Sequence, residues 1–167
     1  MHKIKYTWAD HDQDIQRLAL EIALGGWRPD YIVGISRGGC VPAVMLSHLL
    51  KVPMWSLKVS LRDDVQCESS CWMAEDALGY GISQTKNILI VDDINDSGAT
   101  FKWIQQDWAD SCLPNDPAWD TIWGNSVKFA VLFDNEASEF QNIAYAANTI
   151  NKADQDVWVH FPWEYSA

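Results

Sequence analysis

The sequence predicts an α/β fold in which a doubly wound, mostly parallel sheet is flanked by helices. Three short apolar runs, at 31–35, 88–91 and 127–133, have the length and branched side chains of strands that are buried on both faces. Segments with apolar residues at helical spacing lie between them, and strands that alternate with helices are typical of parallel sheets. Polar, glycine-containing turns follow two of the strands, at 36–39 and 92–100, where such sheets bind their ligands.

The composition indicates one acidic domain. The 167 residues, 48% of them hydrophobic, suffice for a single domain over residues 1–167 with a core at about 27–150. Twenty-three acidic residues against twelve basic ones give a formal charge of −11. This charge disfavours a nucleic-acid surface through long-range repulsion, so we expect no nucleic acid among the partners. An anionic substrate must then be held by local groups, such as a few cations, main-chain amides and magnesium.

The chain has neither a charged-then-apolar leader nor an apolar run of membrane-spanning length, so we expect a soluble, cytoplasmic protein with no membrane partner. The four cysteines, Cys40, Cys67, Cys71 and Cys112, are expected to be free thiols, because a chain of this length and apolar content does not need disulfides. Zinc at Cys67 and Cys71 is the weaker alternative, since no second Cys or His pair stands nearby at ligand spacing.

An amphipathic helix is expected first. Its apolar residues recur at helical spacing from Ile15 to Ala23, Thr7 or Asp10 is a suitable N-cap, and a glycine pair at 25–26 ends it. This helix is expected to pack on the sheet.

A strand at 31–35, a helix at 41–50 and a strand at 54–60 follow. Between the first two lies a polar loop made of Ser36, Arg37, Gly38 and Gly39. The two glycines let the backbone approach a ligand closely, and the arginine places a cation where an anion would bind. The alternative, an ordinary surface turn with an incidental arginine, would be preferred if this loop stood alone.

Residues 61–86 lose the regular pattern. A connection of this length in a compact domain is usually a lid or a disordered insert. A hairpin arm without a catalytic part is the alternative for this segment.

The most informative stretch runs from residue 88 to residue 100. A buried strand at 88–91 ends in two adjacent carboxylates, Asp92 and Asp93, and a small-residue turn then opens a helix at 101–108. Main-chain N–H groups at such a helix start lack intrahelical partners, so they bind phosphate together with nearby hydroxyls. The stretch therefore offers two carboxylates for sugar hydroxyls or a magnesium-bound sugar phosphate, and then a site for an anion. An ordinary strand, turn and N-cap explains Asp96 or Ser97 alone but not two adjacent aspartates.

The rest of the chain supplies two more strands and an aromatic tail. Residues 111–125 are expected to be an insertion that bears an interface, and strands follow at 127–133 and 144–147. The tail at 154–164 contains Trp158 and a Pro-Trp-acid run at 162–164.

These motifs carry a resemblance to a known family. Residues 91–100 resemble, over the whole motif, the phosphoribosyl pyrophosphate signature of the type I phosphoribosyltransferases. The loop at 36–39 is similar to the pyrophosphate loop of that family, especially of its bacterial xanthine-guanine (6-oxopurine) members. The tail, with an aromatic and then a branched aliphatic residue before Pro-Trp-acid, resembles the base-binding hood of those members. The resemblance covers nearly the whole chain in the same order.

The resemblance implies the fold, the reaction and the partners. It implies a small C-terminal hood at about 151–167 that includes the N-terminal segment, a flexible lid at about 61–86 that closes over the reacting centre, and a cis peptide in the loop at 36–39. It implies transfer of a phosphoribosyl group from phosphoribosyl pyrophosphate to a purine base with Mg²⁺, as in purine salvage. We also expect a homodimer or homotetramer.

The resemblance also assigns roles to residues at the strand ends and in the hood. Asp92 and Asp93 would bind the ribose and, through the substrate, Mg²⁺; Asp96 would assist proton movement at the base. The 5′-phosphate would be bound by Asp96, Ser97, Gly98, Ala99 and Thr100. The diphosphate would be bound by Ser36, Arg37, Gly38 and Gly39. The base would be bound by Asn135, Trp158, Val159 and His160. Glu164 is a further candidate metal ligand.

One position departs from the family pattern. In 6-oxopurine enzymes a lysine just beyond the fourth strand donates to the exocyclic oxygen, and Asn135 stands at the matching position here. Guanine, xanthine and hypoxanthine are the expected bases, but an amide either donates or accepts, so the choice between oxo and amino purines stays open. The alternatives are a phosphoribosyltransferase for another base and a non-catalytic nucleotide-binding regulator with the same fold.

Overall fold

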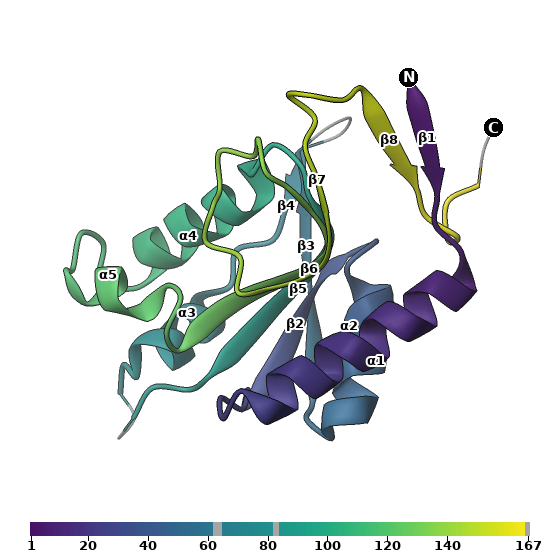
Figure 1. The fold of residues 1–167 in the computed structure, drawn as a ribbon. Helices are drawn as coiled ribbons and strands as arrows, with labels where there is room; N and C mark the ends of the chain where they lie inside the picture. The colour runs from purple at the N-terminus through teal and green to yellow at the C-terminus, as the bar shows by residue number, and fades with distance from the viewer. Residues whose placement is uncertain (62–64, 82–83, 166–167) are drawn as a thin grey trace.

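The computed structural model describes residues 1–61, 65–81 and 84–165. In this part of the chain a six-stranded sheet has the order β4-β3-β2-β5-β6-β7, and β1 and β8 form a separate two-stranded sheet (Figure 1). The strands are β1 His2–Lys5, β2 Tyr31–Ser36, β3 Met54–Ser60, β4 Gln66–Cys67, β5 Ile88–Asn95, β6 Val127–Asn135, β7 Tyr145–Ile150 and β8 Val157–His160. The helices are α1 Trp8–Leu24, α2 Cys40–Leu50, α3 Cys71–Leu78, α4 Ala99–Ser111 and α5 Ala118–Ile122. Among the described strands of the large sheet only β4 runs antiparallel to its neighbour, so the prediction of a mostly parallel sheet is confirmed.

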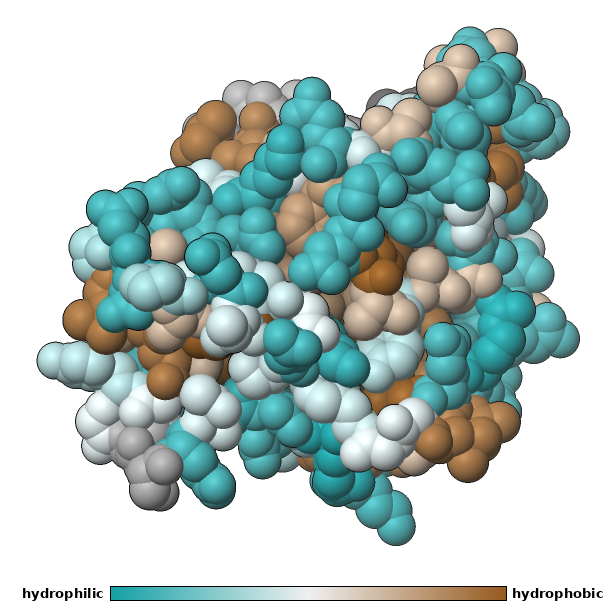
Figure 2. Space-filling view, turned by 60° about the vertical axis from the view of Figure 1, so that its left-hand side comes forward, coloured by the Kyte–Doolittle hydropathy of each residue, from teal (hydrophilic) through white to brown (hydrophobic). Residues whose placement is uncertain are grey.

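Two layers of helices bury the two faces of this sheet. On β5, Ile88 and Ile90 pack in one apolar cluster with α3, α4 and α5, whereas Leu89 and Val91 pack in the other with α1 and α2. This alternation follows from the period of two along a strand. Figure 1 shows the two helical layers on opposite sides of the sheet. On the face shown in Figure 2, hydrophilic residues predominate and hydrophobic ones form small, separate patches.

The strand order reverses between β2 and β5. From β2 the chain passes through α2 to β3 on one side, and from β5 it passes through α4 to β6 on the other side. The two strands are hydrogen-bonded neighbours in parallel register, with Gly34 opposite Val91. The loops that leave their carboxyl ends therefore diverge, which opens a crevice at the usual ligand position of this fold class.

The hood position is occupied by β1 and β8, which pair in parallel with His2 opposite Val157 and Lys5 opposite His160. The sequence pattern did not predict β1, because Ile4 is its single apolar residue. Figure 1 shows the pair projecting from the end of α1, away from the large sheet.

An aromatic cluster attaches the hood to the body. Tyr6 packs edge-to-face on Phe133 and Phe161, with ring centroids 5.1 and 5.8 Å away, and Trp163 stacks on Phe161 at 5.0 Å. His11 of α1 lies beside Trp163 at 5.4 Å and is 1% exposed. Residues from both ends of the chain and from β6 thus hold the hood in place.

His11 should make this attachment sensitive to acid. Burial lowers the pKa of His11 below its ordinary 6.5, while Asp14 and Asp12 oppose the shift. The unfolded chain therefore binds a proton at His11 more readily than the folded protein does. The contribution of neutral His11 to the stability of the fold is complete above pH 6.5 and is lost as pH falls toward the pKa of His11 in the folded state. As pH is lowered from about 7.5 to about 5.5, the melting temperature of His11→Phe should fall less steeply than that of the wild type. Parallel slopes in a thermal melt series would show that His11 does not titrate in this way.

The segment expected to be a lid is partly a core element. Residues 71–78 form α3, and its Met73, Ala74 and Ala77 are buried in the apolar cluster beneath α4. The prediction of a lid over all of 61–86 is therefore wrong for α3, because the apolar residues of this helix pack into the core. Residues 62–64 and 82–83 of the expected lid lie outside the described residues.

The segment at 111–125 contributes to the core through tryptophans. Trp119 is 4% exposed, stacks on Trp123 at 5.3 Å, and donates its indole N–H to the carbonyl of Cys112 at 2.9 Å. These contacts close the edge of the apolar cluster below α4. An interface at this segment stays a prediction.

The boundaries of the other elements differ by a few residues from the sequence predictions. Strand β5 continues to Asn95, so Asp92 and Asp93 lie inside the strand and are followed by two further strand residues. Strand β6 likewise continues to Asn135. The four cysteines are free thiols, as predicted. In the described part of the chain, no helix combines the length and the apolar character needed to cross a membrane.

Candidate active site

A cleft of about 720 Å³ lies at the crevice between β2 and β5. The loops after these strands, the carboxyl half of β3 and the tail of the chain all contribute to it. Its polar lining residues are Ser36, Arg37, Lys58, Ser60, Gln66, Asp92, Asp93, Asn95, Asp96, Ser97, Thr100, Lys152 and Glu164. Its apolar wall near the hood consists of Ile94, Trp158, Val159 and Phe161. The cleft therefore combines a charged end with an aromatic end.

The loop at 36–39 needs glycine at positions 38 and 39, because its backbone lies too close to the end of β5 for side chains there. A Cβ at Gly38 would lie 2.0 Å from Oδ2 of Asp93, and one at Gly39 would lie 2.4 Å from the carbonyl oxygen of Val91. The peptide between Ser36 and Arg37 is cis, as the resemblance implied. The Arg37 side chain is exposed and lines the cleft. The loop thus lies close against the end of β5, and Arg37 adds a cation to the cleft that also contains the acidic pair.

The acidic pair is half-buried at the floor of the cleft. The main-chain N–H of Asp93 donates to the Asp92 carboxylate at 2.8 Å. Burial raises the pKa of Asp93, and the nearby Glu164 carboxylate adds to this rise, while hydrogen bonds from its surroundings oppose it. The carboxylates of Asp92, Asp93 and Glu164 repel one another. A bound cation, or sugar hydroxyls that donate to them, would relieve this repulsion.

The donor set fits a magnesium ion that is shared with a ligand. Among the residues that the structure describes, no three His, Cys, Asp or Glu side chains are grouped so that they would hold a metal by themselves. Oxygen ligands suit Mg²⁺, which is usually held by one or two carboxylates together with substrate phosphates. Asp92 and Asp93 supply such carboxylates. Cys67 and Cys71 lack further zinc ligands in the same part of the chain.

The turn after β5 forms an open helix start. Gly98 precedes α4 with a φ of 90°, and no side chain caps the helix there. The Ser97 hydroxyl accepts from the N–H of Ala99 at 3.3 Å, and Ser97 is exposed. Main-chain N–H groups of the first turn of α4 are thus available to an anion in the cleft.

The loop after β6 holds this turn in place. A Cβ at Gly98 would lie 2.6 Å from the main-chain nitrogen of Phe140, and the N–H of Glu139 donates to the carbonyl of Ser97 at 3.1 Å. The buried amide of Asn95 donates to Asp134 and to the carbonyl of Phe140, both at 2.9 Å. The turn that would bind the phosphate is therefore fixed before any ligand arrives.

Asn135 does not lie at the cleft. Its side chain is buried, donates to the carbonyl of Asp96 at 2.9 Å, and accepts from the N–H groups of Lys152 at 3.0 Å and Ala137 at 3.2 Å. The structure therefore does not bring Asn135 to the cleft, because the oxygen and the nitrogen of its amide are both bound to main chain. Its role is to position the chain at Asp96 and Lys152.

Two lysines that the sequence reasoning missed line the cleft. Lys152, in the turn between β7 and β8, makes an ion pair with Asp96, Nζ to Oδ1, at 3.0 Å. Lys58 of β3 donates to the Gln66 side chain. Both lie far from the signature in sequence, and the alternation of polar and apolar residues over 56–60 is the signal that could have placed Lys58 outside the core.

The hood brings Trp158 but not the His160 side chain to the cleft. Trp158 is 39% exposed and lines the aromatic end, and Val159 also lines it but is only 5% exposed. His160 does not belong to the described lining, and its carbonyl accepts from the N–H of Tyr6 at 3.0 Å. Glu164 reaches the cleft, and its carboxylate accepts from the N–H of Phe161 at 3.1 Å.

Comparison with known proteins gives consistent matches. The model of the phosphoribosyl transferase domain family matches residues 7–167. A xanthine-guanine phosphoribosyltransferase of Idiomarina loihiensis is 26% identical over 140 residues, which cover 80% of this chain and 70% of that protein. A hypoxanthine-guanine phosphoribosyltransferase of Schizosaccharomyces pombe is 24% identical, over 97% of this chain and 89% of that protein. The crystal structure of a purine phosphoribosyltransferase from Pyrococcus horikoshii superposes with a TM-score of 0.69 at 24% identity, over 100% of this chain and 97% of the other.

Proposed function

The chain belongs to the phosphoribosyl transferase domain family, and we propose that it transfers the phosphoribosyl group of phosphoribosyl pyrophosphate to a purine base. The products are a nucleoside monophosphate and inorganic diphosphate. One observation carries this proposal: the acidic pair, Ser36 and Arg37 of the glycine loop and the open start of α4 line a single cleft whose other end is aromatic. The named relatives, which are xanthine-guanine and hypoxanthine-guanine enzymes, support it.

Each part of the cleft suits one part of the reaction. The bond from the anomeric carbon to the diphosphate oxygen breaks and a bond to a base nitrogen forms, so positive charge builds on the ribose and negative charge on the diphosphate. Asp92 and Asp93 would bind the ribose hydroxyls, and Arg37 the leaving diphosphate; preorganised charges of this kind lower the barrier. Bound Mg²⁺ would neutralise part of the diphosphate charge. The start of α4 would hold the 5′-phosphate.

Asp96 is the proposed proton acceptor. It lines the cleft in the turn after β5 and pairs with Lys152, whose ammonium lies 5.4 Å from the centroid of the Trp158 ring at the aromatic end. A base nitrogen loses its proton when the new bond forms, and a carboxylate within hydrogen-bonding reach assists this step.

The expected bases are guanine, xanthine and hypoxanthine, and the reaction would serve purine salvage. The test is to incubate the protein with phosphoribosyl pyrophosphate, Mg²⁺ and each of these bases or adenine, and to separate nucleotides from bases. We expect a nucleoside monophosphate from at least one of the three. If no purine is turned over while phosphoribosyl pyrophosphate still binds, the proposal fails, and the protein is either a phosphoribosyltransferase for another base or a non-catalytic nucleotide-binding regulator.

Trp158→Ala should weaken binding of the base far more than binding of phosphoribosyl pyrophosphate, because Trp158 lies at the aromatic end and away from the acidic pair. Stacking on an aromatic side chain contributes about 1–3 kcal/mol per base in single-strand binders. A roughly 5- to 150-fold rise in the KM of the base is therefore expected. Trp55→Ala is the matched control, since Trp55 is 52% exposed and does not line the cleft. An equal loss for both substrates together with an early melt would assign Trp158 to packing.

A further inference from the structure

Two of the four cysteines lie where α3 and α4 contact each other on one face of the sheet. Cys71 is the first residue of α3 and is exposed, whereas Cys112 follows the last residue of α4 and is 6% exposed. The Cys71 sulfur lies 3.6 Å from the carbonyl oxygen of Ser111. This carbonyl belongs to the peptide bond between Ser111 and Cys112, so the Cys71 thiol lies against the main chain that leads into Cys112.

A carboxylate acts on both of these thiols. The Cys71 sulfur lies 3.4 Å from Oε1 of Glu75, and this hydrogen bond raises the pKa of Cys71. Burial raises the pKa of Cys112, and both Glu75 and Cys71 add to this rise. Cys71, Glu75 and Cys112 therefore form one cluster of titratable groups. The cluster is separate from the active-site cleft, whose described lining contains neither cysteine.

The other two cysteines have different surroundings. Cys40 begins α2, which packs on the opposite face of the sheet. The Cys67 sulfur lies 3.8 Å from the carbonyl oxygen of Ser60, and it is therefore directed toward β3. Of the four cysteines, Cys71 and Cys112 are the pair that the fold brings together from two different helices.

We propose that Cys71 and Cys112 are a redox site that reacts with a small-molecule disulfide, such as oxidised glutathione, and forms a reversible disulfide between α3 and α4. The exposed Cys71 reacts first, as its thiolate, because the thiolate is the attacking form and Cys112 is buried. It attacks one sulfur of the reagent, so a mixed disulfide forms and one glutathione leaves. Cys112 then attacks the Cys71 sulfur, and the second glutathione leaves. The protein loses two hydrogens, and one glutathione disulfide is reduced to two thiols.

The chain before Cys71 is already held against α4. Asp107 of α4 accepts from the Ser69 hydroxyl at 2.6 Å and from the N–H of Ser70 at 3.4 Å. The new bond therefore needs little movement of the backbone, and it closes a loop that contains β5 and α4. A disulfide that closes a loop of this size should raise the melting temperature by about 5–15 °C in a chain of this length.

The experiment equilibrates the protein with oxidised glutathione at about pH 8.5, because the raised pKa values of both thiols slow the exchange at lower pH. Free thiols are then alkylated, and disulfides are mapped by peptide mass spectrometry. We expect a link between Cys71 and Cys112, the higher melting temperature, and loss of both with dithiothreitol. Cys112→Ala should stop at the mixed disulfide on Cys71. Cys67→Ala is the matched control and should form the same link as the wild type.

The mapping uses the wild type, so its result does not depend on how well a variant folds. No link between Cys71 and Cys112, a link from Cys71 to Cys67 instead, or a link that leaves the melting temperature unchanged or lower would overturn the inference. Neither measurement involves turnover of a base. The redox site can therefore fail while the proposed function stands, and the proposed function can fail while the redox site stands.

Discussion

Asp93→Asn should abolish most of the turnover and make the free protein more stable at neutral pH. Asp93 lies beside Gly38 on one side and Asp92 on the other, and Glu164 adds a third carboxylate. Loss of a preorganised charge at a reacting centre costs on the order of 100- to 1,000-fold in kcat. The fold should survive, because the amide has nearly the shape of the carboxylate.

The stability effect follows from the sign of the pKa shift. Burial raises the pKa of Asp93 above its ordinary 3.8, so the folded protein binds this proton more readily than the unfolded chain. The stabilisation that protonated Asp93 contributes is therefore complete below pH 3.8 and is lost as pH rises through the folded-state pKa. The neutral amide of Asp93→Asn escapes this loss, so the gap in melting temperature between variant and wild type should widen from acidic to neutral pH.

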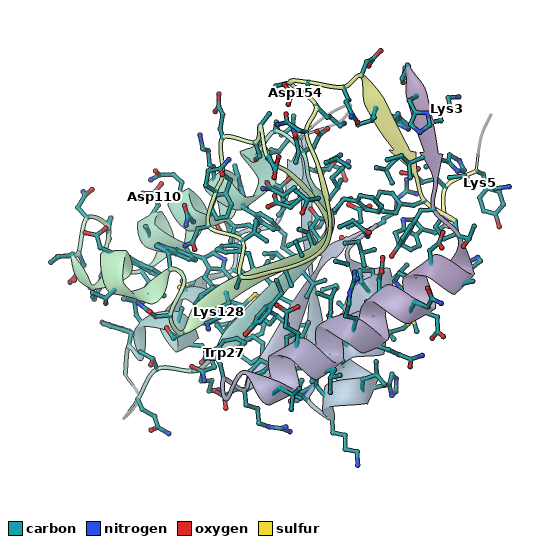
Figure 3. All side chains as sticks on the ribbon, viewed as in Figure 1. Lys3, Lys5, Trp27, Asp110, Lys128 and Asp154 are labelled. Carbon is teal, nitrogen blue, oxygen red and sulfur yellow. The ribbon has the colours of Figure 1, made fainter. Side chains whose placement is uncertain are left out.

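A matched control is Asp110→Asn. Asp110 is exposed on α4 and accepts from the Gln106 side chain at 2.9 Å, away from the hood (Figure 3). It should change neither turnover nor the pH dependence of melting. Near-normal turnover of Asp93→Asn at saturating substrate and Mg²⁺ would remove Asp93 from the reaction.

Asp96→Asn should lower kcat by about 100- to 10,000-fold, which is the range for loss of a general base. Binding of phosphoribosyl pyrophosphate should change little, because the variant keeps the main-chain groups of the turn and the hydrogen bond from Asn135 to the carbonyl at position 96. Single-turnover kinetics measure the chemical step, and equilibrium titration measures the binding.

Asp154→Asn is the control for this change. Asp154 is an exposed aspartate in the turn before β8, and Figure 3 shows it next to the hood. If Asp96→Asn weakened substrate binding and left the single-turnover rate unchanged, Asp96 would be a binding residue only.

The parts of the fold that follow from local patterns were predictable. The buried runs of β2, β5 and β6 and the spacing of α1 depend on the period of each element, and the structure has them within a few residues. Strand β1 was not predictable in this way, because its partner β8 lies at the other end of the chain and its own residues are mostly polar.

The candidate site was predictable where consecutive residues form it. The turns after β2 and β5 supply their functional groups from short runs, and the cleft contains both. Lys152 was missed, and Asn135 was expected at the cleft but lies outside it, because a side chain's direction depends on contacts between segments. Asn135 follows the strand as a ligand-binding residue would, yet its amide is buried against the main chain of Asp96 and Lys152.

The central claim is that this cleft joins a phosphoribosyl group to a purine base. The most direct measurement records phosphorus NMR spectra while phosphoribosyl pyrophosphate is incubated with Mg²⁺, the protein and hypoxanthine or guanine. We expect inorganic diphosphate and nucleoside monophosphate to appear in equal amounts, and neither to form at a comparable rate without the base. Diphosphate release at the same rate without the base, or no change in the substrate signals with any purine, would contradict the account.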